Sequence, residues 1–297
     1  MRIIEPITVT PAMVTASNVP VESLPAWNVG TTYANGARVI FDNGIWESVQ
    51  ASNTGHNPGA DTLSQWWVRR GATNRFRPFD QRLGEGATGG ATITYSIALP
   101  RTLNALCFFG LNGTSVRVRI ITPGPNVIYD RTIQLASRQP AATFWEYIYN
   151  PFTFKPDLVL TGLKLPSGGT VEITINAGAA AQVGEIFLGN DIAVGTTLTG
   201  SRLGIVDYSK KDRDEWGGVF LVPRPVTKTV NFQFSIPTTA AARVQEIIER
   251  VTSKVCVFYA VDGEDPFGTT VAGVMRDYDL TLDAGRSFGT IQAESLT

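Results

Sequence analysis

Short runs of alternating apolar and polar residues are the feature that most constrains the fold of this chain. ATITYSIAL, SVRVRII and TVEITIN alternate in this way and are separated by glycines and prolines that form turns. Because successive side chains of a β-strand point to opposite faces, a period of two predicts strands with one buried face. The intervals between these runs have no helical period, which favours a β-sandwich over alternating strands and helices. We therefore predict a mostly β fold.

Composition changes along the chain predict four segments. Prolines interrupt every regular pattern near the N-terminus, which predicts an extended arm of the kind that often orders only against a neighbour. The predicted segments are the N-terminal arm (1–24), a small aromatic module (25–70), a β-sandwich (71–190) and a C-terminal β domain that serves in assembly (191–297).

Two further elements are predicted in the larger segments. The aromatic run FWEYIYNPFTF is assigned to a strand of the sandwich. One α-helix is predicted over 238–253, because Val244, Ile247, Ile248 and Val251 recur at helical spacing after a threonine N-cap, Thr238 or Thr239. We expect this helix to lie across one face of the C-terminal sheet.

Charge and hydropathy exclude several partners. The chain has 25 Lys and Arg against 26 Asp and Glu, with no long run of one sign, so no global field attracts nucleic acid or an anionic membrane. No apolar stretch approaches the length of a membrane span, and Glu5 and Pro6 interrupt the region where a signal peptide has its apolar core. We expect a protein made in a cytoplasm, without an export signal, a membrane-inserted segment or a cofactor.

Two motifs resemble catalytic or ligand-binding sites, but their context does not fit. Gly84, Gly86 and Gly89 match a dinucleotide-binding spacing, but a strand pattern follows where a helix is required. GRSFG at 285–289 matches a nucleophile elbow, but the only histidine, His56, lies far upstream. One histidine, interpreted as a solvated loop residue, also argues against a zinc site. We predict turns at both glycine motifs and no enzymatic activity.

The cysteines and two acidic clusters leave alternatives open. Cys107 and Cys256 lie in apolar segments and are predicted to be buried thiols, with a long-range disulfide as the alternative. The acidic clusters are Asp212 with Asp214 and Glu215, and Asp262 with Glu264 and Asp265. We interpret both as solvated turns; the alternatives are a glycosidase carboxylate pair and, for the second cluster, weak calcium binding.

The aromatic module is the candidate binding site. It contains Trp27, Tyr33, Trp46, Trp66 and Trp67 within a stretch rich in Asn, Gly, Thr and Ser. A domain this small has room for only a few rings in its core, so some should reach the surface. In a strand, the adjacent Trp66 and Trp67 must point to opposite faces.

At these residues the module resembles the chitin-binding modules of carbohydrate-binding families 5 and 12. The resemblance rests on AW at 26–27, TTY and GARV within 31–39, IWES at 45–48, NPG at 57–59 and WWV at 66–68. It covers about 45 residues and implies a compact three-stranded fold in which exposed rings stack on sugar faces. This chain has Trp46 where the family has tyrosine. Trp27, Trp46 and Trp67 could equally form the core of the module.

The remainder of the chain resembles tail proteins of tailed bacteriophages. VGEIFLGNDIAVG, followed by LGIVDYSKKDRDEWGGVFLVPRP and TVNFQFSI, matches the ordered series in those proteins over residues 76–297. The resemblance implies a jelly-roll or galactose-binding-like sandwich that leads to a C-terminal domain of strands and one helix. It also implies partners, namely other tail proteins and copies of the same chain.

Together these observations predict a structural component of a phage tail tip or baseplate. It would be a symmetric oligomer in the virion tail, assembled in the host cytoplasm, whose module contacts glycans of the host surface. We expect the charged, glycine-rich segment LTGSRLGIVDYSKKDRDEWGG to contact another subunit and not to fold back. The alternatives are a stand-alone carbohydrate-binding protein and, third, a glycoside hydrolase that carries a binding module.

Overall fold

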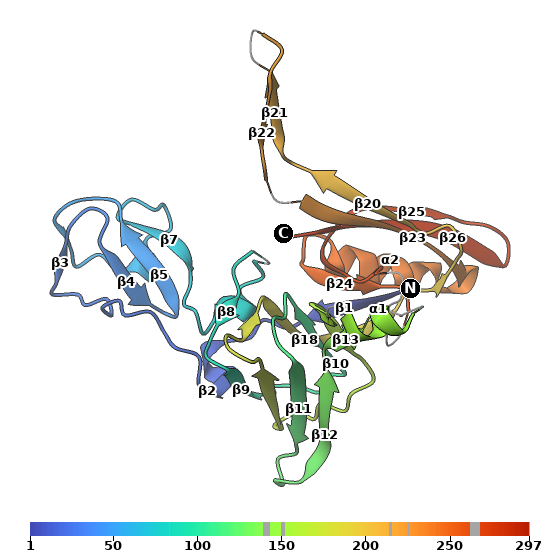
Figure 1. Ribbon diagram of the computed structural model, residues 1–297, viewed down its shortest axis with the longest axis horizontal. Coiled ribbons are helices and arrows are strands. Elements are labelled where there is room, and N and C mark those ends of the chain that lie inside the picture. Colours follow the sequence, from blue (N-terminus) through green and yellow to red (C-terminus); the bar gives the residue numbers. More distant parts are fainter. Residues whose placement is uncertain are drawn as a thin grey trace.

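The fold is described by a computed structural model that covers residues 1–82, 84–138, 143–149, 152–213, 216–224, 226–261 and 268–296. Strands dominate these residues, and two short α-helices and a few 3-10 turns make up the helical part. The predicted mostly β fold is therefore confirmed. Figure 1 shows two larger β units beside each other, with the small module set apart at one side.

The largest element is a ten-stranded antiparallel sheet. Its strands run in the order β15 (Leu158–Leu160), β10 (Ala105–Phe109), β18 (Glu185–Ala193), β1 (Arg2–Pro6), β24 (Cys256–Tyr259), β25 (Val271–Thr281), β26 (Arg286–Ser295), β23 (Val226–Pro237) and β19 (Thr196–Thr197). The tenth strand, β20 (Arg202–Asp207), also pairs with β23. The sheet therefore joins strands from the predicted sandwich to strands from the predicted C-terminal domain.

Strand β1 lies in the middle of this sheet, although its residues were expected in an extended arm. It pairs with β18 on one side and with β24 on the other. Ile3 and Ile4 are fully buried and pack into different clusters on the two faces of the sheet. The arm pattern was misleading because Pro6 lies at the end of β1, where its missing N–H does not interrupt the ladder.

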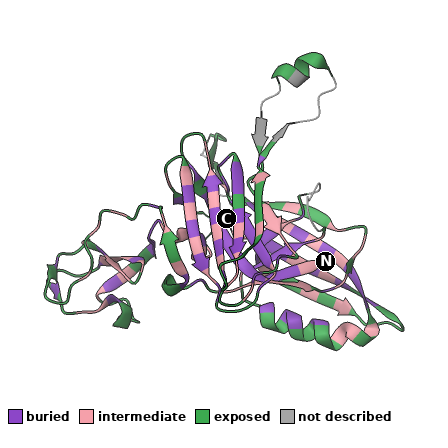
Figure 2. Cartoon of the chain, turned by 90° about the horizontal axis from the view of Figure 1, so that it is seen from below, coloured by how far each residue is buried: buried purple, intermediate pink, exposed green. Residues whose placement is uncertain are grey.

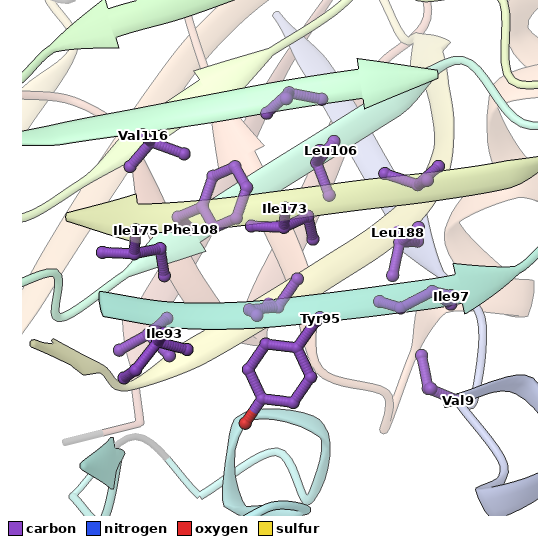
Figure 3. Close-up of a cluster of buried hydrophobic side chains, with 14 of the residues drawn as sticks. Val9, Ile93, Tyr95, Ile97, Leu106, Phe108, Val116, Ile173, Ile175 and Leu188 are labelled. Atoms are coloured by element: carbon purple, nitrogen blue, oxygen red, sulfur yellow. The ribbon is translucent and has the colours of Figure 1, made fainter. Parts of the chain in front are cut away.

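A five-stranded sheet covers one part of the large sheet and forms a sandwich with it. Its order is β12 (Val127–Gln134), β11 (Ser115–Ile121), β16 (Thr170–Asn176), β9 (Thr92–Ala98) and β2 (Val14–Ser17). Alternate residues of β9, such as Ile93 and Ile97, are buried in the same cluster as Phe108 and Leu188 (Figure 3), while the Tyr95 hydroxyl donates to the carbonyl oxygen of Arg75 at 2.9 Å. A two-stranded sheet of β8 (Ala87–Thr88) and β17 (Gln182–Val183) lies at its margin.

Helix α2 (Ala241–Val251) covers the C-terminal part of the large sheet, as predicted. Its four apolar residues at helical spacing are all buried, and Val244, Ile248 and Val251 pack on β23, β24 and β26. Figure 2 shows the opposite side of this helix exposed to solvent. Neither predicted threonine caps α2, because a 3-10 turn (Thr238–Ala240) precedes it and Ala240 is the N-cap. The Thr238 hydroxyl instead donates to the carbonyl oxygen of Asp283.

The predicted strand in FWEYIYNPFTF is wrong at its start. Residues Phe144–Tyr149 form helix α1, and only Phe152–Phe154 form a strand, β14, which pairs with β13 (Ala136–Arg138). The Thr143 hydroxyl accepts a hydrogen bond from the backbone N–H of Glu146, and the Glu146 carboxylate accepts one from Thr143. This reciprocal capping box favours a helix over the strand that the aromatic composition suggested.

Two projections leave the body of the molecule. One carries α1 between β13 and β14, and appears in Figure 2 as a short exposed helix standing away from the sheets. The other is a hairpin of β21 (Lys210–Arg213) and β22 (Val219–Val222), which extends from the top of Figure 1. Among the described residues, β21 and β22 pair only with each other.

Candidate functional site

The aromatic module is built on two small sheets. One has three strands in the order β4 (Arg38–Phe41), β5 (Gly44–Ser48) and β7 (Trp67–Ala72), and the other pairs β3 (Thr32–Tyr33) with β6 (Asn53–Thr54). The strands are short and are joined by tight turns. In the turn between β4 and β5, Asp42 and Asn43 both adopt positive φ. This turn geometry is typical of a two-residue hairpin.

Two of the five predicted site residues form the core of the module. Trp67 is fully buried and Tyr33 nearly so, and their rings meet edge to face with centroids 5.1 Å apart. The Trp67 Nε1 donates to the carbonyl oxygen of His56 at 2.8 Å, and the Tyr33 hydroxyl accepts from the backbone N–H of Asn28. These two rings are thus occupied by packing and have no face to offer a ligand.

The other three rings, Trp27, Trp46 and Trp66, are half-buried around that core. Trp46 donates from Nε1 to the carbonyl oxygen of Phe41, and Trp27 meets the Phe41 ring edge to face. These three are therefore the only rings of the five that reach the surface, and each does so with part of its area. None of the five belongs to the large apolar side chains that are exposed.

Trp66 has the most distinctive environment of the three. Its ring stacks on the imidazole of His56 with centroids 3.7 Å apart and planes 10° from parallel. His56 was expected to be a solvated loop residue; it is instead half-buried and covers one face of this tryptophan. Trp66 lies directly before β7 and is half-buried, whereas Trp67, the first residue of β7, is fully buried.

Asp61 holds the start of β7 in place. Its carboxylate accepts hydrogen bonds from the backbone N–H groups of Gln65, Trp66 and Trp67 at 2.6 to 3.0 Å. Although burial alone would raise the pKa of the Asp61 carboxyl, these backbone donors bring the pKa below its usual value. Sequence reasoning did not single out Asp61, although an acid a few residues before a tryptophan pair is compatible with such a clamp.

A charged cavity of about 370 Å³ lies where the module meets the body of the molecule. Its wall includes Arg38, Arg70, Arg77 and Glu85. Arg70 and Arg38 both contact the Glu47 carboxylate and lower its pKa to about 2, while Arg77 pairs with Glu22 at 3.0 Å. The three arginines that line this cavity are thus already paired with carboxylates outside its wall, which weakens their attraction for an anion.

Exposed apolar side chains concentrate on the two projections and on the strands at the base of the hairpin, β20 and the start of β23. Of the 23 large apolar side chains that are exposed in the described residues, nine lie within 203–226 and five within 144–154. The first group is Leu203, Ile205, Tyr208, Trp216, Val219, Phe220, Leu221, Val222 and Val226, and the second is Phe144, Trp145, Ile148, Tyr149 and Phe154. Patches of this kind on a folded chain mark interaction surfaces.

The segment predicted to contact another subunit has two parts. Its first part folds back, because β20 pairs with β23 along six residues. The second part, hairpin β21–β22, leaves the body (Figure 1). The base of the hairpin is anchored, because the Tyr208 hydroxyl donates to Glu294 at 2.7 Å and Arg276 forms an ion pair with the same carboxylate.

The remaining sequence motifs fall into ordinary structural positions. The glycine-rich motif continues into β8 and β9, and 285–289 is the turn and first residues of β26, with Ser287 buried. Cys107 and Cys256 are both free and buried, as first interpreted, so no disulfide joins them. Of the acidic clusters, Asp214, Glu215 and all of Asp262, Glu264 and Asp265 lie outside the described residues.

The part of the chain that the structure describes contains no candidate metal site and no helix that could span a membrane. No three His, Cys, Asp or Glu side chains in this part gather closely enough to hold a metal ion. The helices in the same residues are too short or too polar to cross a membrane.

Comparison with known proteins identifies no relative of this chain. No protein-family model matches the chain, and no curated protein has significant sequence similarity to it. The two resemblances drawn from the sequence therefore stay expectations, and the geometry above is the basis for any functional proposal.

Proposed function

We propose that this protein is a structural component of a bacteriophage tail tip or baseplate, present in several symmetric copies. The observation that carries the proposal is the concentration of exposed apolar side chains on two projections that point away from the body (Figures 1 and 2). A chain that functions alone rarely exposes such patches, because each apolar group left in water forgoes the gain of burial. The resemblance of residues 76–297 to tail proteins suggests that the assembly is a phage tail.

The architecture supports this role. The strand β1 joins the sandwich to the C-terminal strands in one continuous sheet, so force applied to one unit is transmitted through backbone hydrogen bonds to the other. Such a body can hold its projections in fixed directions, which assembly into a symmetric particle requires. In this proposal the protein is part of the virion and assembles in the host cytoplasm with other tail proteins.

Three experiments test the proposal. Electron microscopy of the purified chain should show closed particles of one size, and sedimentation should give a discrete oligomer. Immunogold labelling of phage particles that contain the protein should place it at the distal end of the tail. Label on the capsid alone, or a chain that stays monomeric at all concentrations, would refute it.

A second candidate function is carbohydrate binding by the module, whether in the particle or as a stand-alone protein. The observation that favours it is the environment of the half-buried Trp66. The imidazole of His56 stacks on one face of its ring and restricts the orientation of the ring. A ring fixed in this way can stack on the apolar face of a pyranose with little loss of side-chain entropy. A glycan array should then show binding by wild type and its loss in Trp66→Ala, while Trp145→Ala, outside the module, keeps it.

A further inference from the structure

An open groove runs along one side of the sandwich, between the free edges of its two sheets. Strand β12 ends the five-stranded sheet and β15 ends the ten-stranded sheet, and no described strand pairs with the outer edge of either. Between them lies a groove of about 430 Å³. Its apolar lining is Ile128, Tyr129, Val159, Leu160 and Leu163, and Arg131 and Lys164 flank it.

The free edges make this groove a site for an added strand. Edge strands present unpaired N–H and C=O groups, which pair readily with another chain. Ile128 on β12 is exposed, and the residues of β15 are only half-buried, so apolar surface also remains to be covered. The occupant that fits is therefore an extended segment with apolar side chains.

Strand β22 has those properties. All four of its residues, Val219–Val222, are apolar and 50 to 63% exposed. Because neighbouring residues point to opposite faces, both faces of β22 are apolar, as is typical of strands buried on both sides. A two-stranded hairpin alone is marginally stable in water, so β21–β22 benefits from a third partner.

The dimensions of the two surfaces agree. The four residues of β22 extend over about 13 Å, and the eight residues of β12 offer an edge long enough to pair with all of them. Added beside β12, the strand would direct one pair of its side chains into the groove toward β15.

The hairpin cannot reach the groove of its own chain. Figure 1 shows the hairpin at one end of the molecule and β12 at the opposite end. The anchor of Tyr208 on Glu294 holds the base of the hairpin to β26, so that it points away from the body. Donor and acceptor at opposite ends define a head-to-tail contact, which closes into a ring when the rotation between copies allows it.

We propose that hairpin β21–β22 of one copy docks as an added strand in the groove between β12 and β15 of the next copy. This inference rests on the proposed function, because it names the contact that builds the symmetric oligomer. The contact is heterologous, so each copy donates one hairpin and accepts one.

A mixing experiment tests the contact. Phe220→Glu alters the donor and Ile128→Glu alters the acceptor, and both positions are exposed, so the fold should survive. Each variant alone should sediment as a monomer, with its self-association weakened about tenfold or more. Mixed together, they should form a one-to-one dimer and nothing larger, because one intact donor meets one intact acceptor. The control Leu63→Glu, on an exposed loop of the module, should assemble as wild type.

The possible outcomes separate the two proposals. A wild-type chain that stays monomeric refutes the symmetric oligomer and this contact together. A wild-type oligomer that persists in both variants refutes only the contact. Loss of assembly in Phe220→Glu but not in Ile128→Glu would also refute it, because the hairpin would then dock elsewhere.

Cysteine cross-linking gives a second measurement. The native thiols of Cys107 and Cys256 are buried, and burial raises the pKa of Cys256 to about 12, so neither competes for the oxidant. A mixture of Phe220→Cys and Ile128→Cys chains should yield a disulfide-linked dimer, which a reducing agent separates into monomers. A mixture of Phe220→Cys and Leu63→Cys should not, and equal yields from the two mixtures would overturn the assignment.

Discussion

The carboxyl group of Glu185 should make the stability of this protein depend on pH between weakly acidic and weakly basic conditions. Glu185 is the first residue of β18 and is fully buried. Neither carboxyl oxygen has a hydrogen bond of normal geometry within the described residues, although the backbone N–H groups of Gln81 and Arg82 lie near. Burial, and secondly the neighbouring Asp80 carboxyl, raise the pKa of Glu185 from 4.5 to about 8.

The sign of the effect follows from proton linkage. Between the two pKa values the unfolded chain is ionised at Glu185, while the folded chain holds a proton there, so folding takes up a proton. Stability therefore falls as pH rises through this window, by at most about 1.4 kcal/mol per pH unit, and levels off above the folded pKa. The rise from 4.5 to about 8 corresponds to a loss of at most about 5 kcal/mol.

Other charged groups near Glu185 modify this slope. Burial also raises the pKa of Asp80, while Arg82 and Arg69 act on the Asp80 carboxyl in the opposite direction. The two carboxyls interact, so their titrations are coupled. The predicted slope belongs to this pair, and Glu185 supplies the larger part because it is the more deeply buried.

Glu185→Gln should remove the slope, because the amide keeps the shape of the side chain without a titrating proton. Urea unfolding followed by circular dichroism between about pH 5 and about pH 8 should show the variant several kcal/mol more stable than wild type at the basic end and nearly equal at the acidic end. Glu172→Gln is the control, since Glu172 lies partly exposed on β16 in an ion pair with Arg119 and should change stability by less than about 1 kcal/mol. Parallel pH profiles for wild type and Glu185→Gln would refute the reasoning.

Three further predictions concern packing and the module. Trp67→Ala should destabilise the module by about 3 to 5 kcal/mol and raise amide exchange in β4, β5 and β7 but not in β9, whereas the exposed Trp145→Ala should change stability by less than about 0.5 kcal/mol. As pH falls through the lowered pKa of Asp61, its three backbone hydrogen bonds weaken, so the protection factors of the amides of Gln65–Trp67, taken relative to the intrinsic exchange rate at each pH, should fall in acid in wild type and be low at all pH values in Asp61→Ala. Gly189→Ala should cost about 1 to 3 kcal/mol by thermal unfolding, because the added Cβ would lie 2.3 Å from the Glu5 carbonyl oxygen, whereas Gly178→Ala meets nothing within 4 Å.

Part of the fold was predictable because local patterns agree with tertiary burial. The strand at β16 reads TVEITIN, and its Val171, Ile173 and Ile175 are buried as the alternation requires. Helix α2 was predictable for the same reason, at a period of 3.6. The helix at α1 was missed because its aromatic residues suggest strand, while the capping box between Thr143 and Glu146 is a local signal that was not used.

The candidate site was predictable in composition but not in exposure. The sequence places five rings in one small module, but it cannot say which of them form the core, because a tryptophan in a binding face and one in a core look alike in a strand. Trp67 and Tyr33 became the core because β7 and β3 bring their rings together. The exposed apolar strand β22 reads in sequence like a buried strand, and only its place on a projection distinguishes the two.

By itself, the sequence determined the class of fold and the positions of most of the main strands and of α2. These follow from interactions between residues close along the chain, which periodicity records. Only the tertiary structure decided that β1 lies between β18 and β24, that Glu185 is buried beside Asp80, and that β12 and β15 leave their edges open. Each of these depends on which distant segments meet, and a single sequence carries no local record of that choice.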